Sequence, residues 1–273
     1  MVQENILIVG CGKMGKALIN GWLNDGLQID NLQVIEIEDH DKIRNELHNS
    51  KISICSSLSE LPKSFSPNII VFAIKPQISK TLLPLYASYV EKKTLFLSIM
   101  GGVTTFSLKG LLGNSAKVVR AMPNTPAAIG KGVSVIFAGT DVSSSEKKIC
   151  EELMKTVGSC EWITSEDSMD AVTALSGSGP AYVFYLSQAM AEAGVELGLP
   201  SDLSEKLARL TIYGSGSLLV QKNTSSIELR ENVTSKGGTT EAALKILEKN
   251  NVFKKLMTNA IRKAKERSIE LGK

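Results

Sequence analysis

Histidine is almost absent from this 273-residue chain, which has only His40 and His48. Both stand in a polar stretch that we expect at the surface. The chain contains neither an H-E-x-x-H nor a G-x-S-x-G motif, the usual signatures of zinc proteases and serine esterases. The sequence therefore does not support metal-dependent hydrolysis or serine-esterase chemistry.

Cysteine is also scarce, and its spacing carries no metal or redox motif. The four cysteines are Cys11, Cys55, Cys150 and Cys160, with no C-x-x-C pair among them. We expect reduced thiols in the core or in loops and no metal site. A disulfide or a metal site is the alternative.

The sequence lacks a long apolar run and a strong charge of either sign. No stretch approaches the length needed to span a membrane. The first residues show no basic segment followed by an apolar stretch and a cleavage site, so no secretory signal is indicated. The formal net charge of +3 is too small to favour nucleic acid or an anionic membrane as a partner. We expect a cytoplasmic protein that binds neither.

Short apolar runs alternate with helical patterns in the first part of the chain. The runs are Ile6–Val9, Leu32–Ile37, Ile52–Ile54, Ile69–Ile74, Leu95–Ile99, Val118–Met122, Val133–Phe137 and Trp162–Ile163. They are nearly continuous rather than alternating, which is typical of strands buried on both faces of a mainly parallel sheet. We therefore predict a doubly wound α/β domain over residues 1–164.

The pattern changes after Thr164. Residues 170–194 and 202–220 read as helices, a polar stretch covers residues 223–240, and a last helix is expected over residues 241–271. No convincing strand appears in this part. We predict a smaller, all-helical second domain over residues 165–273.

A glycine-rich loop leaves the first expected strand and enters a helix. It reads Gly10-Cys11-Gly12-Lys13-Met14-Gly15, a G-x-G-x-x-G pattern in the context that dinucleotide binding requires. Gly10 permits a tight turn, Gly12 allows a pyrophosphate close to the backbone, and Gly15 allows the helix to pack on the sheet. The alternative is a glycine-rich turn without a ligand.

Acidic residues follow the second expected strand. Glu36, Glu38, Asp39 and Asp41 stand where the 2′-phosphate of NADPH would come, and Lys42 is the nearest cation. An acid at this place binds the ribose 2′-hydroxyl of NADH, and repulsion disfavours a phosphate. We lean towards NADH as the cofactor over NADPH. The alternative is that Asp39 or Asp41 caps the next helix and points away.

Five further segments resemble pyrroline-5-carboxylate reductase, and together they span most of the chain. They are F-A-I-K-P at residues 72–76, S-I-M-G-G-V at 98–103, R-A-M-P-N-T-P at 120–126, S-G-S-G-P-A-Y at 176–182 and S-K-G-G-T-T at 235–240. The resemblance implies a Rossmann domain followed by a helical dimerisation domain, and a homodimer or a ring of dimers. It also implies hydride transfer from NAD(P)H to the C=N bond of 1-pyrroline-5-carboxylate, the last step of proline biosynthesis. Such a reduction needs few titratable groups, because a protonated imine is already an electrophile.

The resemblance also assigns residues to the cofactor. Ala73, Lys75 and Pro76 are expected beside the nicotinamide ribose, and Met122, Pro123 and Asn124 near the nicotinamide. Lys75 could instead be a solvated loop lysine. Arg120 could form a structural ion pair or contact a ligand.

The segment at residues 235–240 is expected to hold the substrate. Gly237 and Gly238 would leave backbone amides accessible to a carboxylate, with Ser235, Thr239 and Thr240 adding hydroxyl donors. In the family the last threonine of G-G-T-T contacts the ring nitrogen, so Thr240 is the expected proton donor or orienter. Asn232 and Val233 would flank the substrate. The family usually has proline where this chain has Lys236, and a plain helix N-terminus is the alternative.

The final helix carries an apolar stripe of Phe253, Met257, Ile261 and Ala264, which is expected either in a dimer interface or packed within its own subunit. Two rival functions remain open. A β-hydroxyacid dehydrogenase would need a lysine in its inter-domain helix, and residues 170–192 contain none. A nucleotide-sensing protein without catalysis would have no need of the G-G-T-T segment.

Overall fold

The computed structural model describes residues 3–37, 40–47, 49, 51–221 and 224–272. Glu38, Asp39 and His48, which entered the sequence analysis, lie outside the described residues. The chain forms two compact units, one of Met1–Ser178 with Ala264–Lys273 and the other of Gly179–Lys263. The break between them follows Ser178, whereas the sequence pattern changes near Thr164.

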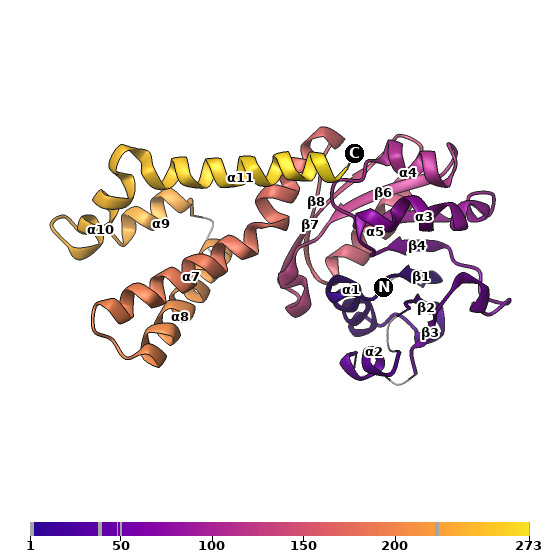
Figure 1. The fold of residues 1–273 in the computed structure, drawn as a ribbon, viewed down its shortest axis with the longest axis horizontal. Coiled ribbons are helices and arrows are strands. Elements are labelled where there is room, and N and C mark those ends of the chain that lie inside the picture. The colour runs from indigo at the N-terminus through magenta and orange to yellow at the C-terminus, as the bar shows by residue number, and fades with distance from the viewer. Residues whose placement is uncertain (1–2, 38–39, 48, 50, 222–223, 273) are drawn as a thin grey trace. The chain divides into compact units, whose positions relative to one another are not determined.

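The first unit is built on an eight-stranded sheet (Figure 1). The strands are β1 Ile6–Val9, β2 Leu32–Ile35, β3 Ser53–Cys55, β4 Ile69–Phe72, β5 Leu95–Ser98, β6 Lys117–Met122, β7 Gly132–Ala138 and β8 Gly158–Trp162. Their order across the sheet is β3-β2-β1-β4-β5-β6-β7-β8. The β6–β7 pair is antiparallel and the other neighbouring pairs are parallel. The predicted mainly parallel, doubly wound sheet is confirmed.

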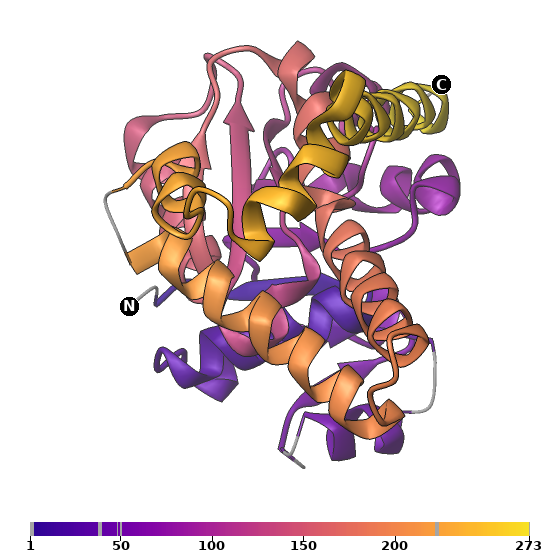
Figure 2. The ribbon, with the colours of Figure 1, turned by 90° about the vertical axis from the view of Figure 1, so that its left-hand side faces the viewer.

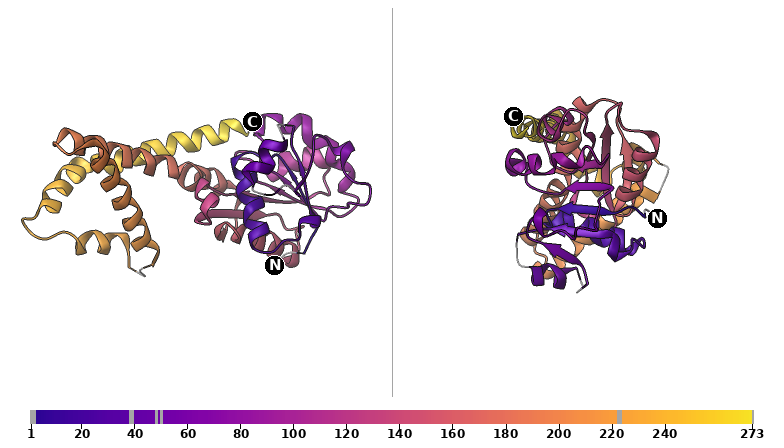
Figure 3. Two further views of the ribbon diagram at one scale, coloured as in Figure 1. Left: turned by 90° about the horizontal axis from the view of Figure 1, so that it is seen from below. Right: turned by 90° about the vertical axis from the view of Figure 1, so that its right-hand side faces the viewer.

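Both faces of the central strands β1, β4 and β5 are buried, as the continuous apolar runs predicted, whereas β8 at the edge of the sheet has exposed residues. In β1, Ile6 and Ile8 belong to one core cluster and Leu7 and Val9 to another, because successive side chains point to opposite faces. Helices α1 Lys13–Asn24, α2 His40–Glu46 and α5 Ser144–Lys155 cover the first face. Helix α4 Thr105–Leu112 and the 3₁₀ segment Leu83–Tyr89 cover the second (Figure 3). Helices α3 Ser79–Leu82 and α6 Met169–Val172 also belong to this unit.

The described residues of the second unit form helices joined by loops, with no strand among them (Figure 2). Its helices are α7 Gly179–Glu196, α8 Ser201–Gln221, α9 Ser226–Asn232, α10 Thr239–Glu248 and the first part of α11 Val252–Leu271. The prediction of an all-helical second half is confirmed. None of the helices within the described residues is both long enough and apolar enough to cross a membrane.

One detail of the helical prediction was wrong, and one helix was not predicted. The expected last helix over residues 241–271 is broken, because Asn250 and Asn251 adopt left-handed backbone with φ of 54° and 56°. Asparagine tolerates this region better than most residues, so the pair ends one helix before the next begins. The expected polar stretch contains a helix, α9, whose N-terminus is capped by Ser225 accepting from the Glu228 N–H at 3.1 Å.

Candidate functional site

The glycine-rich loop follows β1, at the place where the strand order reverses between β2 and β4. Gly10 has a φ of 95°, and a Cβ on it would come within 2.6 Å of the Ala73 carbonyl oxygen. A Cβ on Gly15 would come within 2.6 Å of the Gly10 carbonyl oxygen. Both glycines are therefore required by close packing between the loop, helix α1 and the end of β4.

Gly12 has no such requirement. A Cβ on it would meet no protein atom within 4 Å, and its φ of −68° and ψ of −169° are open to any residue. Gly12 is the N-cap of α1, where no side chain caps the helix and no acid stands in the first turn. The helix start therefore faces open space with its positive dipole end, which fits the pyrophosphate of a dinucleotide. A side chain at residue 12 would fill that space.

The Glu36 carboxylate is anchored to this loop. Its Oε2 accepts from the Cys11 N–H at 2.7 Å and its Oε1 accepts from the Ile37 N–H at 2.8 Å. Asp41 lies instead in the first turn of α2 and pairs with Arg44 at 3.0 Å. Glu36 is therefore held beside the glycine loop. Asp41 lies at the start of the next helix, as the alternative in the sequence analysis has it.

Two further groups of expected cofactor residues lie at the same edge of the sheet. Ala73, Lys75 and Pro76 follow β4, and Ala73 donates its N–H to the Val9 carbonyl at 2.8 Å. Met122 ends β6, and Pro123 and Asn124 follow it. Because β1, β2, β4, β5 and β6 are parallel, their carboxyl ends share one edge with the glycine loop.

Arg120 forms an ion pair inside the first unit. Its side chain is only 4% exposed, and its Nη1 lies 2.6 Å from Oε1 of Glu166. Glu166 also accepts from the Thr105 N–H at 2.7 Å and from the Thr105 hydroxyl at 2.5 Å. Of the two alternatives for Arg120, the structure has the ion pair.

The glycines of the G-G-T-T segment do not leave their amides accessible, contrary to expectation. Gly237 donates its N–H to Oε2 of Glu241 at 2.7 Å, and Gly238 donates to the Ser235 carbonyl at 3.0 Å. The glutamate reaches back because it stands three residues after the helix N-cap, Gly238, and a carboxylate there satisfies free N–H groups. That spacing is visible in the sequence and could have been found there.

The structure gathers the other expected substrate residues around the same loop of the helical unit. Thr239 and Thr240 form the first turn of α10, which follows Ser235 to Gly238. Asn232 ends α9, and Val233 follows as an exposed residue. The expected substrate residues thus lie on one short stretch of chain, and the expected cofactor residues lie on the sheet unit.

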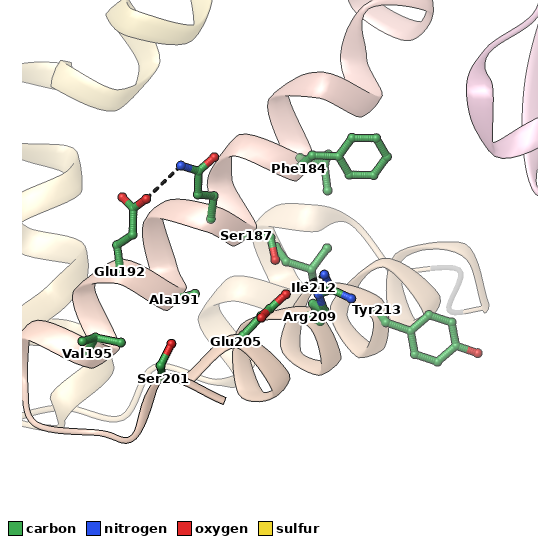
Figure 4. A pocket seen from close by; sticks show the side chains of 12 residues that line it. Phe184, Ser187, Ala191, Glu192, Val195, Ser201, Glu205, Arg209, Ile212 and Tyr213 are labelled. Carbon is green, nitrogen blue, oxygen red and sulfur yellow. Dashed lines mark hydrogen bonds and ion pairs between the residues drawn. The ribbon is translucent and has the colours of Figure 1, made fainter. Parts of the chain in front are cut away.

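A groove of about 720 Å³ runs between α7 and α8 and contains none of the expected site residues (Figure 4). Apolar side chains line much of it, including Val183, Phe184 and Ile212. Four of its polar side chains pair along their own helices, Gln188 with Glu192 at 2.8 Å and Arg209 with Glu205 at 2.6 Å. An open groove of this composition fits another protein surface better than a small polar ligand.

The four cysteines are all buried, and none of them forms a disulfide. Burial raises the pKa of the Cys160 thiol to about 12 and raises the pKa of the Cys150 thiol as well. Within the described part of the chain, no three His, Cys, Asp or Glu side chains come together as a metal site.

The sheet and its glycine loop together define a dinucleotide-binding protein of the Rossmann class. Two family models match the chain: "Pyrroline-5-carboxylate reductase dimerisation" over residues 166–271 and "NADP oxidoreductase coenzyme F420-dependent" over residues 5–102. The pyrroline-5-carboxylate reductase of Pseudomonas aeruginosa is 35% identical over 100% of this chain and 98% of its own. That of Pisum sativum is 32% identical over 97% of this chain and 94% of its own. The chain belongs to the pyrroline-5-carboxylate reductase family.

Solved structures agree with this membership. A pyrroline-5-carboxylate reductase from Coxiella burnetii has a TM-score of 0.90 and 32% identity, covering 100% of both chains. The pyrroline carboxylate reductase of Plasmodium falciparum, with NADP bound, has a TM-score of 0.86 and 33% identity over 100% of both chains. The chain is thus a nicotinamide-cofactor oxidoreductase of this family, and its second half carries the family's dimerisation domain.

Proposed function

We propose that this protein reduces the C=N bond of 1-pyrroline-5-carboxylate with NAD(P)H to give L-proline, the last step of proline biosynthesis. The observation that carries the dinucleotide part of the proposal is Gly12, a glycine that the fold does not need, at the start of α1, where the pyrophosphate would bind. Full-length similarity to pyrroline-5-carboxylate reductases supports the choice of reaction.

The residues at the carboxyl edge of the sheet suit a dinucleotide. Gly10, Cys11, Gly12, Lys13, Met14 and Gly15 would hold the pyrophosphate at the start of α1. Ala73, Lys75 and Pro76 would flank the nicotinamide ribose, and Met122, Pro123 and Asn124 would line the nicotinamide end. When bound, the reduced dinucleotide supplies the hydride. The protein's part is to fix the distance and angle at which substrate and donor meet.

The loop before α10 is the proposed substrate site. The hydroxyls of Ser235 and Thr239 would hold the carboxylate, with Asn232 and Val233 at its sides. The Gly237 and Gly238 N–H groups would join them where the substrate displaces their present acceptors, Glu241 and the Ser235 carbonyl. Thr240 would place its hydroxyl at the ring nitrogen, which is adjacent to the carbon that bears the carboxylate. One short loop can therefore hold both groups of a five-membered imino acid.

Glu241 adds a condition to this assignment. Its carboxylate accepts from the Gly237 N–H and pairs with Lys245 at 3.3 Å, so a substrate carboxylate must displace it to reach that amide. Among the described residues, no carboxylate is bonded to the hydroxyl groups of Ser235 and Thr239. We infer that the affinity for the carboxylate depends on the hydroxyls of Ser235 and Thr239 and on the free energy needed to displace Glu241.

We propose NADH as the preferred cofactor. Support comes from the anchored Glu36, because two backbone N–H groups hold its carboxylate beside the loop and hinder it from turning away. A fixed carboxylate accepts from the ribose 2′-hydroxyl of NADH and repels the 2′-phosphate of NADPH. The relative with NADP bound supports the phosphorylated cofactor instead, so NADPH is the alternative.

We further propose a homodimer, alone or within a ring of dimers. In helices α7 to α10 the buried residues are Ser204 and Ala208, while many large apolar side chains are exposed. Helices in water are held mainly by burial of an apolar face, which this unit achieves only when a second copy covers it. The groove between α7 and α8 is the natural place for that contact.

The functional division into residues 1–164 for the dinucleotide and 165–273 for substrate and dimerisation is part of this proposal. The start of the dimerisation family model at residue 166 supports it. A cytoplasmic location stays a prediction, to be checked by fractionation of cells that express the tagged protein.

The deciding experiment follows the absorbance of NADH and of NADPH with 1-pyrroline-5-carboxylate as the acceptor. We expect oxidation only after the imine acid is added, with proline as the product. The carboxylate-free ring, 1-pyrroline, should react with a sharply raised KM. If neither cofactor is oxidised although both bind, the nucleotide-sensing alternative would replace the enzyme.

A further inference from the structure

Asn124 is a buried polar residue whose side chain joins two backbone segments. It is 9% exposed and follows the carboxyl end of β6. Its Oδ1 accepts from the Val133 N–H at 2.9 Å, and its Nδ2 donates to the Ser176 carbonyl at 3.1 Å. Since one partner is a donor and the other an acceptor, only this orientation of the amide satisfies both.

The Ser176 carbonyl needs that donor. It belongs to a π-helical turn, Thr173–Gly177, in which the Ser178 N–H donates to the Thr173 carbonyl at 2.8 Å. In an α-helix the Ser176 carbonyl would accept from residue 180, but that residue is a proline, which has no N–H. Asn124 supplies the missing donor from outside the helix.

The π-helical turn packs against the edge of the sheet that carries the proposed nicotinamide site. A Cβ on Gly177 would come within 2.6 Å of Cε of Met122, so the Met122 side chain lies against the turn. A Cβ on Gly101, in the loop after β5, would lie 3.9 Å from the Thr173 methyl. The turn therefore backs the ends of β5 and β6, and single-turn π-helices occur often at functional sites.

We propose that Asn124 is a positioning residue, which holds the π-helical turn on the edge of the sheet and so fixes Met122 and Pro123 where the nicotinamide is expected. The inference rests on the proposed function and departs from the expectation that Asn124 contacts the cofactor. A side chain whose donor and acceptor both serve the backbone would have to give up one of these bonds to bind a ligand. Asn124 would affect the reaction by fixing the positions of Met122 and Pro123.

The test uses Asn124→Ala and Asn124→Asp. The aspartate keeps the acceptor for Val133 but replaces the donor to Ser176 with an oxygen. We expect both variants to lose roughly tenfold to hundredfold in kcat, since small misplacements are costly in hydride transfer. The Kd of NADH should change less than threefold. Asn68→Asp is the matched control, because Asn68 Oδ1 likewise accepts a backbone N–H, from Asn5 at 2.9 Å, before β4 begins.

Amide hydrogen exchange gives a readout that does not need activity. In both variants residues 173–178 should exchange faster, and β1 should be unchanged. A second readout uses Pro180→Ala, which restores the missing N–H. Asn124→Ala should then reduce kcat less in the Pro180→Ala protein than in the native protein. Should Asn124→Ala fail to fold, Asn124→Asp carries the same measurements.

The outcomes separate the two ideas. A raised Kd for NADH with native kcat at saturation would make Asn124 a cofactor ligand and overturn the inference. The inference would also be overturned if residues 173–178 exchanged at the native rate in both Asn124 variants. It would be overturned as well if the effects of Asn124→Ala and Pro180→Ala on kcat were additive. A native protein without imine reductase activity would overturn the proposed function, while the exchange measurements would still decide the role of Asn124.

Discussion

The Cys11 N–H donates to Oε2 of Glu36 at 2.7 Å, and this bond joins the glycine loop to the end of β2. The bond places a negative charge at a fixed position beside the loop that is expected to hold the cofactor. The preference for NADH or NADPH should therefore depend on whether this charge repels the 2′-phosphate of NADPH.

Glu36→Gln is expected to shift the ratio of kcat/KM values towards NADPH by about tenfold, which is roughly 1.4 kcal/mol. The amide keeps one acceptor oxygen, so the loop should stay in place while the charge is lost. Asp41→Asn is the matched control, since Asp41 pairs with Arg44 on α2, and it should leave the ratio unchanged. Equal ratios in all three proteins would show that Glu36 does not face the ribose.

Gly12→Val should raise the Kd of either dinucleotide by roughly tenfold to hundredfold, because its side chain would occupy the space of the pyrophosphate. The Tm should stay close to native, since a Cβ there meets no protein atom. Gly110→Val, at an equally open position on α4, should change neither quantity strongly. Gly15→Ala should lower the Tm instead, because its Cβ would come within 2.6 Å of a backbone oxygen. Normal binding by Gly12→Val would refute the loop assignment.

Thr240→Ala should reduce kcat by a factor that corresponds to about 1–3 kcal/mol, with a smaller change in KM. Thr240→Ser retains the hydroxyl and should recover most of the rate. Gly238→Val should mainly raise KM, because its side chain would come within 2.5 Å of the Ser235 hydroxyl and distort the loop. A native rate in Thr240→Ala would mean that the proton comes from water or from the substrate itself.

The layout of the sheet could be predicted from the sequence because strands buried on both faces read as unbroken apolar runs, as Ile6–Val9 does. The glycine loop could be predicted because its spacing and its context are both local. The anchoring of Glu36 by Cys11 could not, since it depends on the three-dimensional approach of residues 25 apart in the chain. The Asn124–Ser176 bond could not be predicted for the same reason. One indication of it is present in the sequence, because Pro180 leaves a missing N–H inside a helical pattern. The break at Asn250 was missed because helical apolar spacing continues on both sides of it.

Glu146 gives a prediction on stability and pH. It forms a capping box with Ser143 at the start of α5, and its Oε1 lies 2.7 Å from Nζ of Lys117. Burial raises the pKa of this carboxyl, but the hydrogen bonds from Lys117 and Ser143 outweigh it and lower the pKa overall. A lowered folded-state pKa stabilises the protein above the unfolded pKa, about 4.3, and the gain is lost as the pH falls through the folded value.

Glu146→Gln should therefore lower the free energy of unfolding by about 1 kcal/mol at pH 7 and by progressively less below about pH 4. Urea denaturation at several pH values measures this. Glu152→Gln is the control on the same helix, since Glu152 lies 3.9 Å from the exposed Lys148 and should contribute little. A pH-independent difference would assign the effect to packing rather than to charge.

The exposed apolar side chains of the helical unit give a prediction on assembly. Phe184 on α7 is 66% exposed and lines the groove beside α8, and Phe106 on α4 of the sheet unit is 87% exposed. If a second copy covers the groove, Phe184→Glu would bury an unpaired charge in the interface and should dissociate the dimer at micromolar concentration. The same change at Phe106 should leave the mass unchanged. Light scattering measures the mass, and kcat measured in parallel shows whether the separated subunits are still active. A native protein that is monomeric at micromolar concentration and fully active would contradict the proposed dimer, and so would a Phe184→Glu variant of native mass.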